Sequence, residues 1–233
     1  MDHQENPATQ CVAGFSHYLF AQHPHLVAMA FWNQQFATPD FKYGTAPNEF
    51  LREQAFRIPP HGSVLVPGDG EGRNGVWLAE QGHRVTAVDI SDVGLAKARA
   101  LAAERGVVVD TVVADLAEWE PGEKSVDAVV LTYVHFPADV RAIIHRKLLS
   151  ALRIGGVLIL EAFHPSQLGP GRFGPKDVTM LYTLDLLRSD LASVPNAAFE
   201  ELVAWEGTTH LHEGRGHQGD GQVTRLVARR VAE

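Results

Sequence analysis

Three glycines and one acidic residue have the types and the spacing that ligand chemistry requires. Gly68, Gly70 and Gly72 follow the apolar run at 64–66, and Asp89 comes about 20 residues after Gly70. Because glycine has no Cβ, this backbone can turn sharply and approach a ligand at the carboxyl edge of a parallel sheet. A carboxylate at position 89 can accept hydrogen bonds from both hydroxyl groups of a ribose. The pattern therefore predicts a binding site for a nucleoside.

The same spacing fits two kinds of nucleoside ligand. Gly70, Gly72 and Gly75, followed by an acid about 20 residues later, also match the fingerprint of dinucleotide-binding folds. A NAD-dependent oxidoreductase is therefore one interpretation. The other is a protein that binds S-adenosylmethionine, because Glu71 and Arg73 in the turn suit a zwitterionic amino-acid tail better than a pyrophosphate. Arg73 is then available to the carboxylate of that tail.

A second acidic residue favours S-adenosylmethionine. Asp115 and Leu116 end the third predicted strand, where a carboxylate can hold the amino group of an adenine. The dinucleotide pattern requires no acid at this place. A methyltransferase is therefore the preferred interpretation. The alternatives are the oxidoreductase and a non-catalytic protein that holds the methyl donor without turning it over.

These residues need a framework that brings the ends of several strands together. From Val64 onward, short apolar runs alternate with amphipathic stretches of helical length, which predicts strand–helix units and a parallel sheet. We expect an α/β fold with a Rossmann-like, doubly wound sheet of seven strands, mostly parallel, with an antiparallel C-terminal strand. The expected strands are 64–66, 84–89, 107–113, 126–132, 157–162, 200–209 and 223–231.

Capping residues and breakers place the helices and loops. Ser91 suits the N-cap of a helix that runs to Arg105, and Gly106 suits its end. The stretch 165–175 holds three prolines and three glycines, which predicts a loop. The glycines between 214 and 221 predict a glycine-rich link between two antiparallel strands. The other expected helices are 74–81, 138–152 and 184–192.

Composition limits the class of protein. A chain of 233 residues with 45% hydrophobic content can bury one sizeable core. The formal net charge of −8 repels phosphate backbones and anionic lipids, which argues against nucleic-acid and membrane partners. Cys11 is the only cysteine, and no apolar run approaches the roughly 20 residues that span a bilayer. We expect a cytoplasmic monomer or homodimer.

The acid-x-Gly-x-Gly turn, the acid that ends the second strand and the Asp-Leu pair after the third resemble the class I S-adenosylmethionine-dependent methyltransferases. The resemblance covers about residues 31–233 and is nearest to the branch of tellurite-resistance and thiopurine methyltransferases. Segments 31–36 and 43–51 resemble the part that precedes the sheet there and closes over the cofactor. Many members have an acid where Val66 stands and a cysteine where Asp69 stands. Residues 211–219 resemble the tail of uncharacterised bacterial members.

The resemblance implies a cofactor and a set of residues that bind it. The cofactor is S-adenosyl-L-methionine, the product is S-adenosyl-L-homocysteine, and the methyltransferase domain is 31–233. Residues 1–30 are then an N-terminal extension, helical or disordered. Trp32 and Tyr43 are expected at the cofactor through the resemblance alone. The expected cofactor-binding residues are Trp32, Tyr43, Pro67, Gly68, Asp69, Gly70, Gly72, Arg73, Asn74, Asp89, Ile90, Ser91, Asp115, Leu116, Thr132 and Tyr133.

Residues after the fourth strand are candidates for the chemistry. The acceptor is expected to be a small molecule, and a thiol, a hydroxyl or a metalloid oxyanion all fit. For a thiol or hydroxyl, His135 is the first candidate for the general base, followed by Tyr133 and His164. The alternative is that His135 only packs against the cofactor or caps the helix that begins near Pro137.

Three histidines near the C-terminus suggest a metal site. His210 and His212 lie on one face of a strand, and His217 follows them closely. No cysteine is near. We therefore expect a solvated hairpin here, and we assign no metal.

Overall fold

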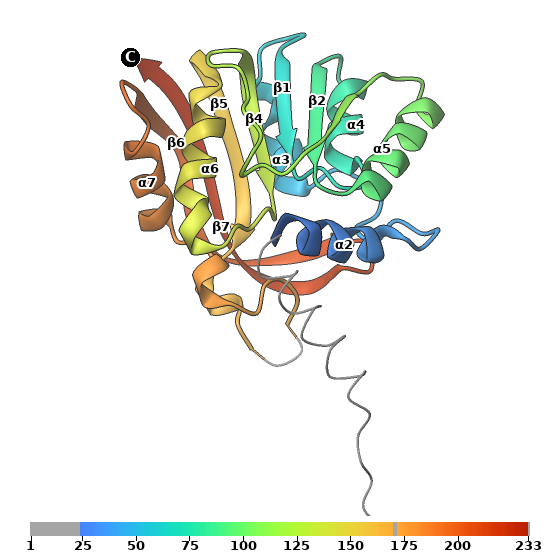
Figure 1. The fold of residues 1–233 in the computed structure, drawn as a ribbon. Helices are drawn as coiled ribbons and strands as arrows, with labels where there is room; N and C mark the ends of the chain where they lie inside the picture. Colours follow the sequence, from blue (N-terminus) through green and yellow to red (C-terminus); the bar gives the residue numbers. More distant parts are fainter. Residues whose placement is uncertain (1–23, 170–171, 233) are drawn as a thin grey trace, which may run out of the picture.

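The computed structural model describes residues 24–169 and 172–232. The chain alternates strands with helices in the order that the sequence predicts (Figure 1). Most of the expected N-terminal extension, residues 1–23, lies outside the described residues. Its last part belongs to a helix, α2 (Pro24–Phe36), which runs across the expected boundary at residue 30. Among the described residues, no helix is both long enough and apolar enough to cross a membrane.

The sheet has seven strands in the order β3-β2-β1-β4-β5-β7-β6. Five of them pair in parallel, and β7 is antiparallel to both of its neighbours. The predicted fold class is therefore confirmed. The strands are β1 (Ser63–Pro67), β2 (Arg84–Asp89), β3 (Asp110–Val113), β4 (Val126–Thr132), β5 (Leu152–Phe163), β6 (Ala198–Glu213) and β7 (His217–Ala232).

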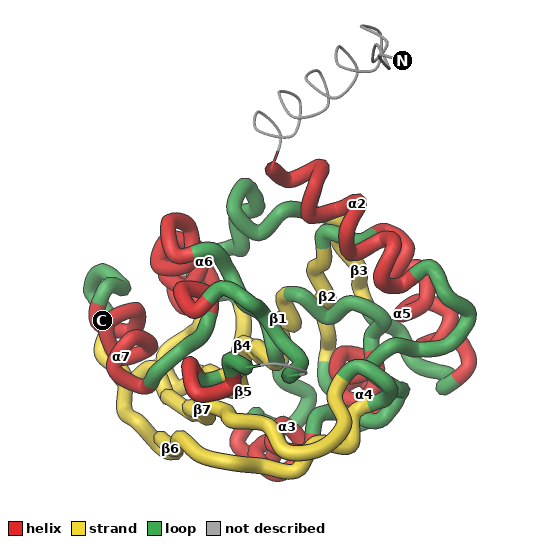
Figure 2. Tube along the Cα trace, turned by 90° about the horizontal axis from the view of Figure 1, so that it is seen from below, coloured by secondary structure: helices red, strands yellow, loops and turns green. Residues whose placement is uncertain are grey.

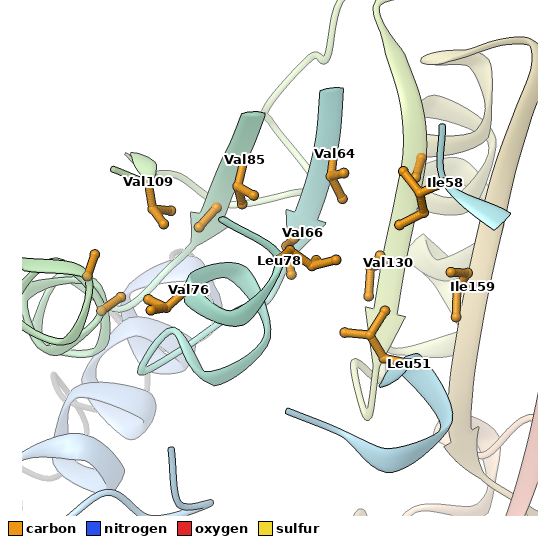
Figure 3. Packing of buried hydrophobic residues seen from close by; sticks show 14 of the residues in the cluster. Leu51, Ile58, Val64, Val66, Val76, Leu78, Val85, Val109, Val130 and Ile159 are labelled. Atoms are coloured by element: carbon orange, nitrogen blue, oxygen red, sulfur yellow. The ribbon is translucent and has the colours of Figure 1, made fainter. Parts of the chain in front are cut away.

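Helices cover both faces of the sheet. One core contains Val64 and Val66 of β1 and packs against α3 (Glu49–Gln54), α4 (Arg73–Glu80) and α5 (Asp92–Glu104), as Figure 3 shows for part of it. The other contains Leu65 of the same strand, because successive side chains point to opposite faces. It packs against α6 (Ala138–Ser150) and α7 (Leu184–Ala192). Short 3-10 turns lie at Ala55–Arg57, Pro165–Gln167 and Val178–Met180.

Local signals fix several helix ends as predicted. The Ser91 hydroxyl accepts a hydrogen bond from the Gly94 N–H and caps α5, and Thr183 caps α7 in the same way. The third strand starts later than predicted, at Asp110. Its expected first residue, Val107, instead donates its N–H to the Ala102 carbonyl at the end of α5. That backbone group is thus unavailable to the sheet.

The expected glycine-rich link is the largest difference in the fold. Strands β6 and β7 continue until Glu213 pairs with His217, so only residues 214–216 form the turn. The Gly216 N–H donates to the Lys42 carbonyl at 2.9 Å, and a Cβ on Gly216 would lie 2.3 Å from the Tyr43 ring. These glycines therefore allow a close approach between two backbones and do not form a loose connection. Seen from below, the hairpin and α2 border the carboxyl ends of the strands on opposite sides (Figure 2).

Candidate cofactor and acceptor site

The glycine turn between β1 and α4 adopts the backbone that its sequence predicts. Gly68, Gly70 and Gly72 have φ values of 66°, 57° and 90°, which L side chains rarely adopt. A Cβ on Gly70 would lie 3.0 Å from the Phe36 ring, so α2 packs directly over this turn. A Cβ on Gly72 would lie 2.6 Å from that of Ala98. Gly72 is therefore required for the packing of α4 against α5.

Asp89 lies directly beside this turn. Its Oδ2 accepts a hydrogen bond from the Gly70 N–H, and its Oδ1 accepts one from the Ser91 N–H, both at 2.8 Å. Burial raises the pKa of Asp89, and these N–H groups act in the opposite direction. Each carboxylate oxygen keeps a further lone pair, because an ionised carboxylate offers about four acceptor sites. The structure thus brings the turn and Asp89 together.

The second acid lies at the adjacent strand end. The Ala114 N–H donates to the Asp89 carbonyl at 3.0 Å, which places Asp115 next to the end of β2. The Asp115 carboxylate accepts from the Ala117 N–H at 2.8 Å. Leu116 belongs to the core on the α6 side of the sheet. Asp115 therefore lies beside the end of β2, whereas Leu116 packs in the interior.

Helix α2 is fastened to the start of α5. The Ser91 hydroxyl donates to Asn33 Oδ1 at 2.6 Å, and Asn33 Nδ2 donates to Asp92 at 2.7 Å. Trp32 stacks on Phe36 with ring centroids 5.5 Å apart. Ser91 therefore serves both as the cap of α5 and as the anchor of α2. The half-buried Ile90, which precedes Ser91, and the buried Pro67, which ends β1, flank the turn.

The two charged residues of the turn have different partners. Glu71 forms an ion pair with Lys97 and accepts the Lys42 N–H at 2.7 Å, so its proposed contact with an amino-acid tail is not supported. Arg73 forms a buried ion pair with Glu213 at 3.0 Å. Its other terminal nitrogen, Nη1, is buried without a hydrogen-bond partner among the described residues. Arg73 can therefore still donate to the carboxylate of a ligand.

Asp69 caps α4. Its Oδ1 accepts from the Gly75 N–H at 3.1 Å, and its Oδ2 is buried without a partner among the described residues. Burial raises the pKa of Asp69 to about 7, and the nearby charge of Asp89 acts in the same direction. Asp69 therefore exchanges a proton more readily near neutral pH than an ordinary aspartate does.

Nucleoside binding fits the residues at this edge. Asp89 offers carboxylate oxygens beside the glycine turn, and Arg73 offers an unpaired buried donor. A ribose and a carboxylate are the partners that these groups prefer. S-adenosylmethionine carries both.

A buried polar network that the sequence did not reveal joins α3, α4, β4, β5 and β6. Asn48, the N-cap of α3, donates from Nδ2 to Glu161 at 2.9 Å and to Glu213 at 2.8 Å. Its backbone N–H donates to Asn74, whose own Nδ2 donates to Thr132 at 2.6 Å. Asn74 and Thr132 are therefore brought together, as expected. Glu161 was missed because it stands inside a predicted strand, and Glu213 was missed because the resemblance of segment 211–219 gave no residue a role.

His135 is engaged at both ring nitrogens. Its Nδ1 lies 2.7 Å from the Met180 carbonyl, and its Nε2 accepts from the Phe163 N–H at 3.2 Å. Burial lowers the pKa of His135 to about 4, so the ring is neutral near pH 7. The lone pair that a general base needs is thus occupied by the backbone. This geometry argues against the base role, and His135 does not cap α6, which has no side-chain cap hydrogen bond.

Tyr133 and His164 are also poorly arranged as bases. Burial, with the charges of Glu161 and Glu213, raises the pKa of Tyr133 well above its ordinary value. Tyr133 has a φ of 56° and stacks on Phe163 with centroids 4.4 Å apart. In His164, Nδ1 accepts from the Ser166 N–H at 3.1 Å.

His217 does not lie in a solvated hairpin, so that expectation is wrong for this residue. It is only 5% exposed, and its Nδ1 lies 3.0 Å from Glu213 Oε2. Its ring lies beside four others, with centroid distances of 4.6 Å to Tyr43, 4.7 Å to Tyr133, 5.1 Å to Phe163 and 5.4 Å to Phe173. We call these four rings and His217 the aromatic cluster.

The neighbouring histidines behave differently. His210 is exposed and pairs with Asp220 at 2.6 Å, and its ring lies 4.5 Å from that of His212. In the part of the chain that the structure describes, no three potential metal ligands lie close enough together to hold an ion.

Comparison with known proteins gives a match to a family model and a relative. Residues 64–156, which contain the turn, Asp89 and Asp115, match a family model described as a methyltransferase domain. A 2-heptyl-1-hydroxyquinolin-4(1H)-one methyltransferase from Mycobacteroides abscessus is 28% identical over 148 residues. That alignment covers 61% of this chain and 64% of the relative, so the chain spans less than two thirds of the relative's length.

Two solved structures share the fold over most of the chain. TehB from Haemophilus influenzae has a TM-score of 0.63 and 18% identity, covering 87% of this chain and 66% of that one. The 1,6-didemethyltoxoflavin-N1-methyltransferase from Burkholderia thailandensis has a TM-score of 0.57 and 20% identity, covering 99% and 93%. It was solved with bound 1,6-didemethyltoxoflavin and S-adenosylhomocysteine.

Proposed function

We propose that this chain, which has the class I methyltransferase fold and a methyltransferase domain at 64–156, is an S-adenosylmethionine-dependent methyltransferase of small molecules. The resemblance to the branch that includes TehB is confirmed at the level of the fold. One observation carries the proposal: the Asp89 carboxylate is hydrogen-bonded to the Gly70 N–H inside the matched domain. The cofactor domain is proposed to include α2, because Phe36 packs onto the turn and Asn33 is hydrogen-bonded to Ser91 at the start of α5.

The chain's residues have separate tasks in this reaction. Bound S-adenosylmethionine supplies a methyl group that is activated by its attachment to a sulfonium. Asp89 binds the ribose hydroxyls, and Arg73 Nη1 donates to the carboxylate of the amino-acid tail. The protein must otherwise align the acceptor, exclude water and remove a proton when the acceptor is neutral. No nucleophilic side chain is needed.

The aromatic cluster supports a planar aromatic acceptor. Rings of this kind bind flat heterocycles by stacking and edge contacts, each worth about 0.5–1.5 kcal/mol beyond area burial. The relative from Mycobacteroides abscessus is named for a hydroxyquinolone, and the structure from Burkholderia thailandensis holds a heterocyclic acceptor. We therefore place a hydroxyl on an aromatic heterocycle first among acceptors. Thiols and metalloid oxyanions follow.

Calorimetry and product analysis test this function. S-adenosylmethionine, S-adenosylhomocysteine and NAD are titrated in turn, and methylation of 2-heptyl-1-hydroxyquinolin-4(1H)-one is followed by mass spectrometry. We expect both adenosyl ligands to bind more tightly than NAD, and a mass gain of one methyl group in the acceptor. Tighter binding of NAD would support the oxidoreductase alternative. Binding without turnover of hydroxyl, thiol and oxyanion acceptors would support the non-catalytic one.

The proposal also covers the partner class, the cell compartment and the oligomeric state. The formal net charge of −8 supports a small-molecule acceptor over nucleic acid, because it repels phosphate. A single cysteine, Cys11, is consistent with the cytoplasm. Size-exclusion chromatography with light scattering distinguishes the proposed monomer and homodimer from larger assemblies.

A further inference from the structure

The tip of the β6–β7 hairpin lies at the edge of the sheet where methyl transfer is proposed. Because β7 is antiparallel to β5, its first residues lie at the carboxyl ends of the parallel strands. Glu213 Oε2 is 3.0 Å from Arg73 Nη2 and 3.0 Å from His217 Nδ1. The Glu213 carboxylate therefore connects His217 to Arg73, the arginine proposed to hold the amino-acid tail of the cofactor.

The contact with Glu213 fixes the ring of His217. A carboxylate only accepts hydrogen bonds, so Nδ1 must carry the proton and Nε2 keeps its lone pair. Among the described residues Nε2 has no hydrogen-bond partner, and 6% of the His217 side chain is exposed. His135 differs, because the Phe163 N–H occupies its Nε2. His217 has the free acceptor that His135 lacks.

Glu213 remains ionised in this arrangement. Burial alone would raise the pKa of Glu213, but the hydrogen bond from His217 and the charge of Arg73 outweigh it and lower the value to about 2. Burial lowers the pKa of His217, and Glu213 opposes that shift. The ring is thus neutral near pH 7, and its Nδ1 is held by a negative charge that would stabilise an imidazolium.

We propose that His217 is the general base of the proposed methyl transfer, with Glu213 as its positioning residue, and that the acceptor is a hydroxyl-bearing aromatic molecule bound at the aromatic cluster. The hydroxyl oxygen forms a bond to the methyl carbon, and the carbon–sulfur bond breaks with its electron pair moving to sulfur. The hydroxyl proton moves to Nε2 of His217 and is later released to water. This inference rests on the proposed function.

The variant His217→Asn tests the role of Nε2. Asparagine places its amide nitrogen near the position of Nδ1, so it keeps the donor to Glu213 and removes Nε2. Two phenols serve as acceptors, 2-naphthol and the more acidic 4-nitrophenol, at a pH between their pKa values. We expect kcat for neutral 2-naphthol to fall about a hundredfold or more, and kcat for ionised 4-nitrophenol to stay near the wild-type value. Equal losses with both phenols, or no loss with 2-naphthol, would overturn the base role.

A matched control lies on the same hairpin. His210 is exposed and paired with Asp220, away from the aromatic cluster, so His210→Asn should leave both rates unchanged. S-adenosylhomocysteine affinity is measured in every variant. If the wild-type protein binds no S-adenosylhomocysteine, the proposed function fails. If it binds and methylates but His217→Asn loses nothing with 2-naphthol, only the present inference fails.

Histidine NMR gives a readout that needs no turnover. In protein labelled with ¹⁵N-histidine, the His217 signal is assigned by its loss in His217→Asn. We expect the tautomer protonated at Nδ1, and a shift of the Nε2 signal when 2-naphthol is added. Glu213→Gln should weaken that tautomer preference, because glutamine can accept or donate. A wild-type ring protonated at Nε2 would overturn the inference whatever the acceptor results.

Discussion

The Oδ2 atom of Asp89 accepts a hydrogen bond of 2.8 Å from the backbone N–H of Gly70, although the two residues are 19 positions apart. This contact ties the end of β2 to the glycine turn after β1. It also orients the carboxylate before any ligand binds. A ligand that uses Asp89 therefore meets a group whose conformational freedom is already restricted.

Replacing Asp89 tests the ribose contact. Asp89→Ala removes a charge-assisted hydrogen bond, and we expect S-adenosylhomocysteine binding to weaken by about 2 kcal/mol, roughly thirtyfold. Calorimetry at a temperature where the variant is folded measures this change. Asp139→Ala, an exposed acidic residue in the first turn of α6, is the matched control and should bind normally. Unchanged affinity in folded Asp89→Ala would remove the ribose role.

Gly72 and Gly106 offer a paired test of the turn. Both have positive φ, but a Cβ on Gly72 would lie 2.6 Å from that of Ala98, whereas a Cβ on Gly106 has nothing within 4 Å. We expect Gly72→Ala to lower the free energy of unfolding by about 2–5 kcal/mol, from backbone strain and overpacking. Gly106→Ala should cost only about 1–2 kcal/mol from the strain. Urea denaturation measures both.

A second substitution separates the two contributions to the Gly72 effect. Ala98→Gly removes the methyl group that a Cβ at position 72 would strike. In the Gly72→Ala background it should restore part of the lost stability, even though glycine inside a helix costs about 1 kcal/mol. A double variant no more stable than Gly72→Ala, after allowance for that helix cost, would show that the Ala98 methyl group is not the cause, because the Ala98 Cα, 2.7 Å from a Cβ at position 72, is still present.

The predictable parts of this protein are those that neighbouring residues determine. The Gly68–Gly72 turn needs positive φ, Ser91 caps the helix that follows it, and the end of β2 lies about 20 residues from the turn, as in nucleoside-binding folds. The first two signals lie within a few residues of the feature that they fix, and the third is a fixed spacing along the chain. The sheet and half of the candidate site follow from them.

The acceptor half of the site depends on contacts between distant residues. Asn48 donates hydrogen bonds to Glu161 and Glu213, which are 113 and 165 positions away in the sequence. No spacing rule predicts such partners. His217 is buried because residues 214–216 form a short turn that packs onto Tyr43. The sequence shows the glycines of this turn, but it does not show which backbone segment they approach. The hairpin was therefore expected to be solvated.

Asp69 predicts a specific pH dependence of stability. Burial raises its pKa from 3.8 to about 7 in the folded protein, so the folded state holds this proton over that interval while the unfolded state has lost it. The stability that Asp69 contributes is fully present below its pKa in the unfolded state. It is lost as the pH rises through its pKa in the folded state, and the free energy of unfolding falls by about 1.4 kcal/mol per pH unit between the two values. We expect wild-type stability to fall relative to Asp69→Asn between about pH 4 and pH 7.

Urea denaturation of both proteins across this range measures the difference. Asparagine keeps an oxygen that can accept the Gly75 N–H and cannot ionise, so other titrating groups cancel in the comparison. Parallel curves for the two proteins would contradict a raised pKa at Asp69. A difference that grows from about pH 4 and keeps growing above pH 7 would place the folded-state pKa higher still.

The position of Arg73 predicts that its substitution weakens the binding of a ligand only when the amino-acid tail of that ligand is present. Its Nη1 is buried without a partner among the described residues, and its Nη2 is held by Glu213 at 3.0 Å. If Nη1 binds the carboxylate of the amino-acid tail, Arg73→Lys should weaken S-adenosylhomocysteine binding by about 1.5–3 kcal/mol, roughly ten- to a hundredfold. Lysine keeps the positive charge beside Glu213 but cannot reproduce the planar pair of donors.

The matched ligand is 5′-methylthioadenosine, which keeps the ribose and adenine and lacks the amino-acid tail. Arg73→Lys should bind it as the wild-type protein does, whereas Asp89→Ala should bind both ligands more weakly, because Asp89 is assigned to the ribose that they share. Calorimetry with two ligands and three proteins gives the complete comparison. If Arg73→Lys loses affinity for both ligands equally, Arg73 acts through the structure of the turn and not through the tail. If it loses affinity for neither, the carboxylate of the tail is held elsewhere.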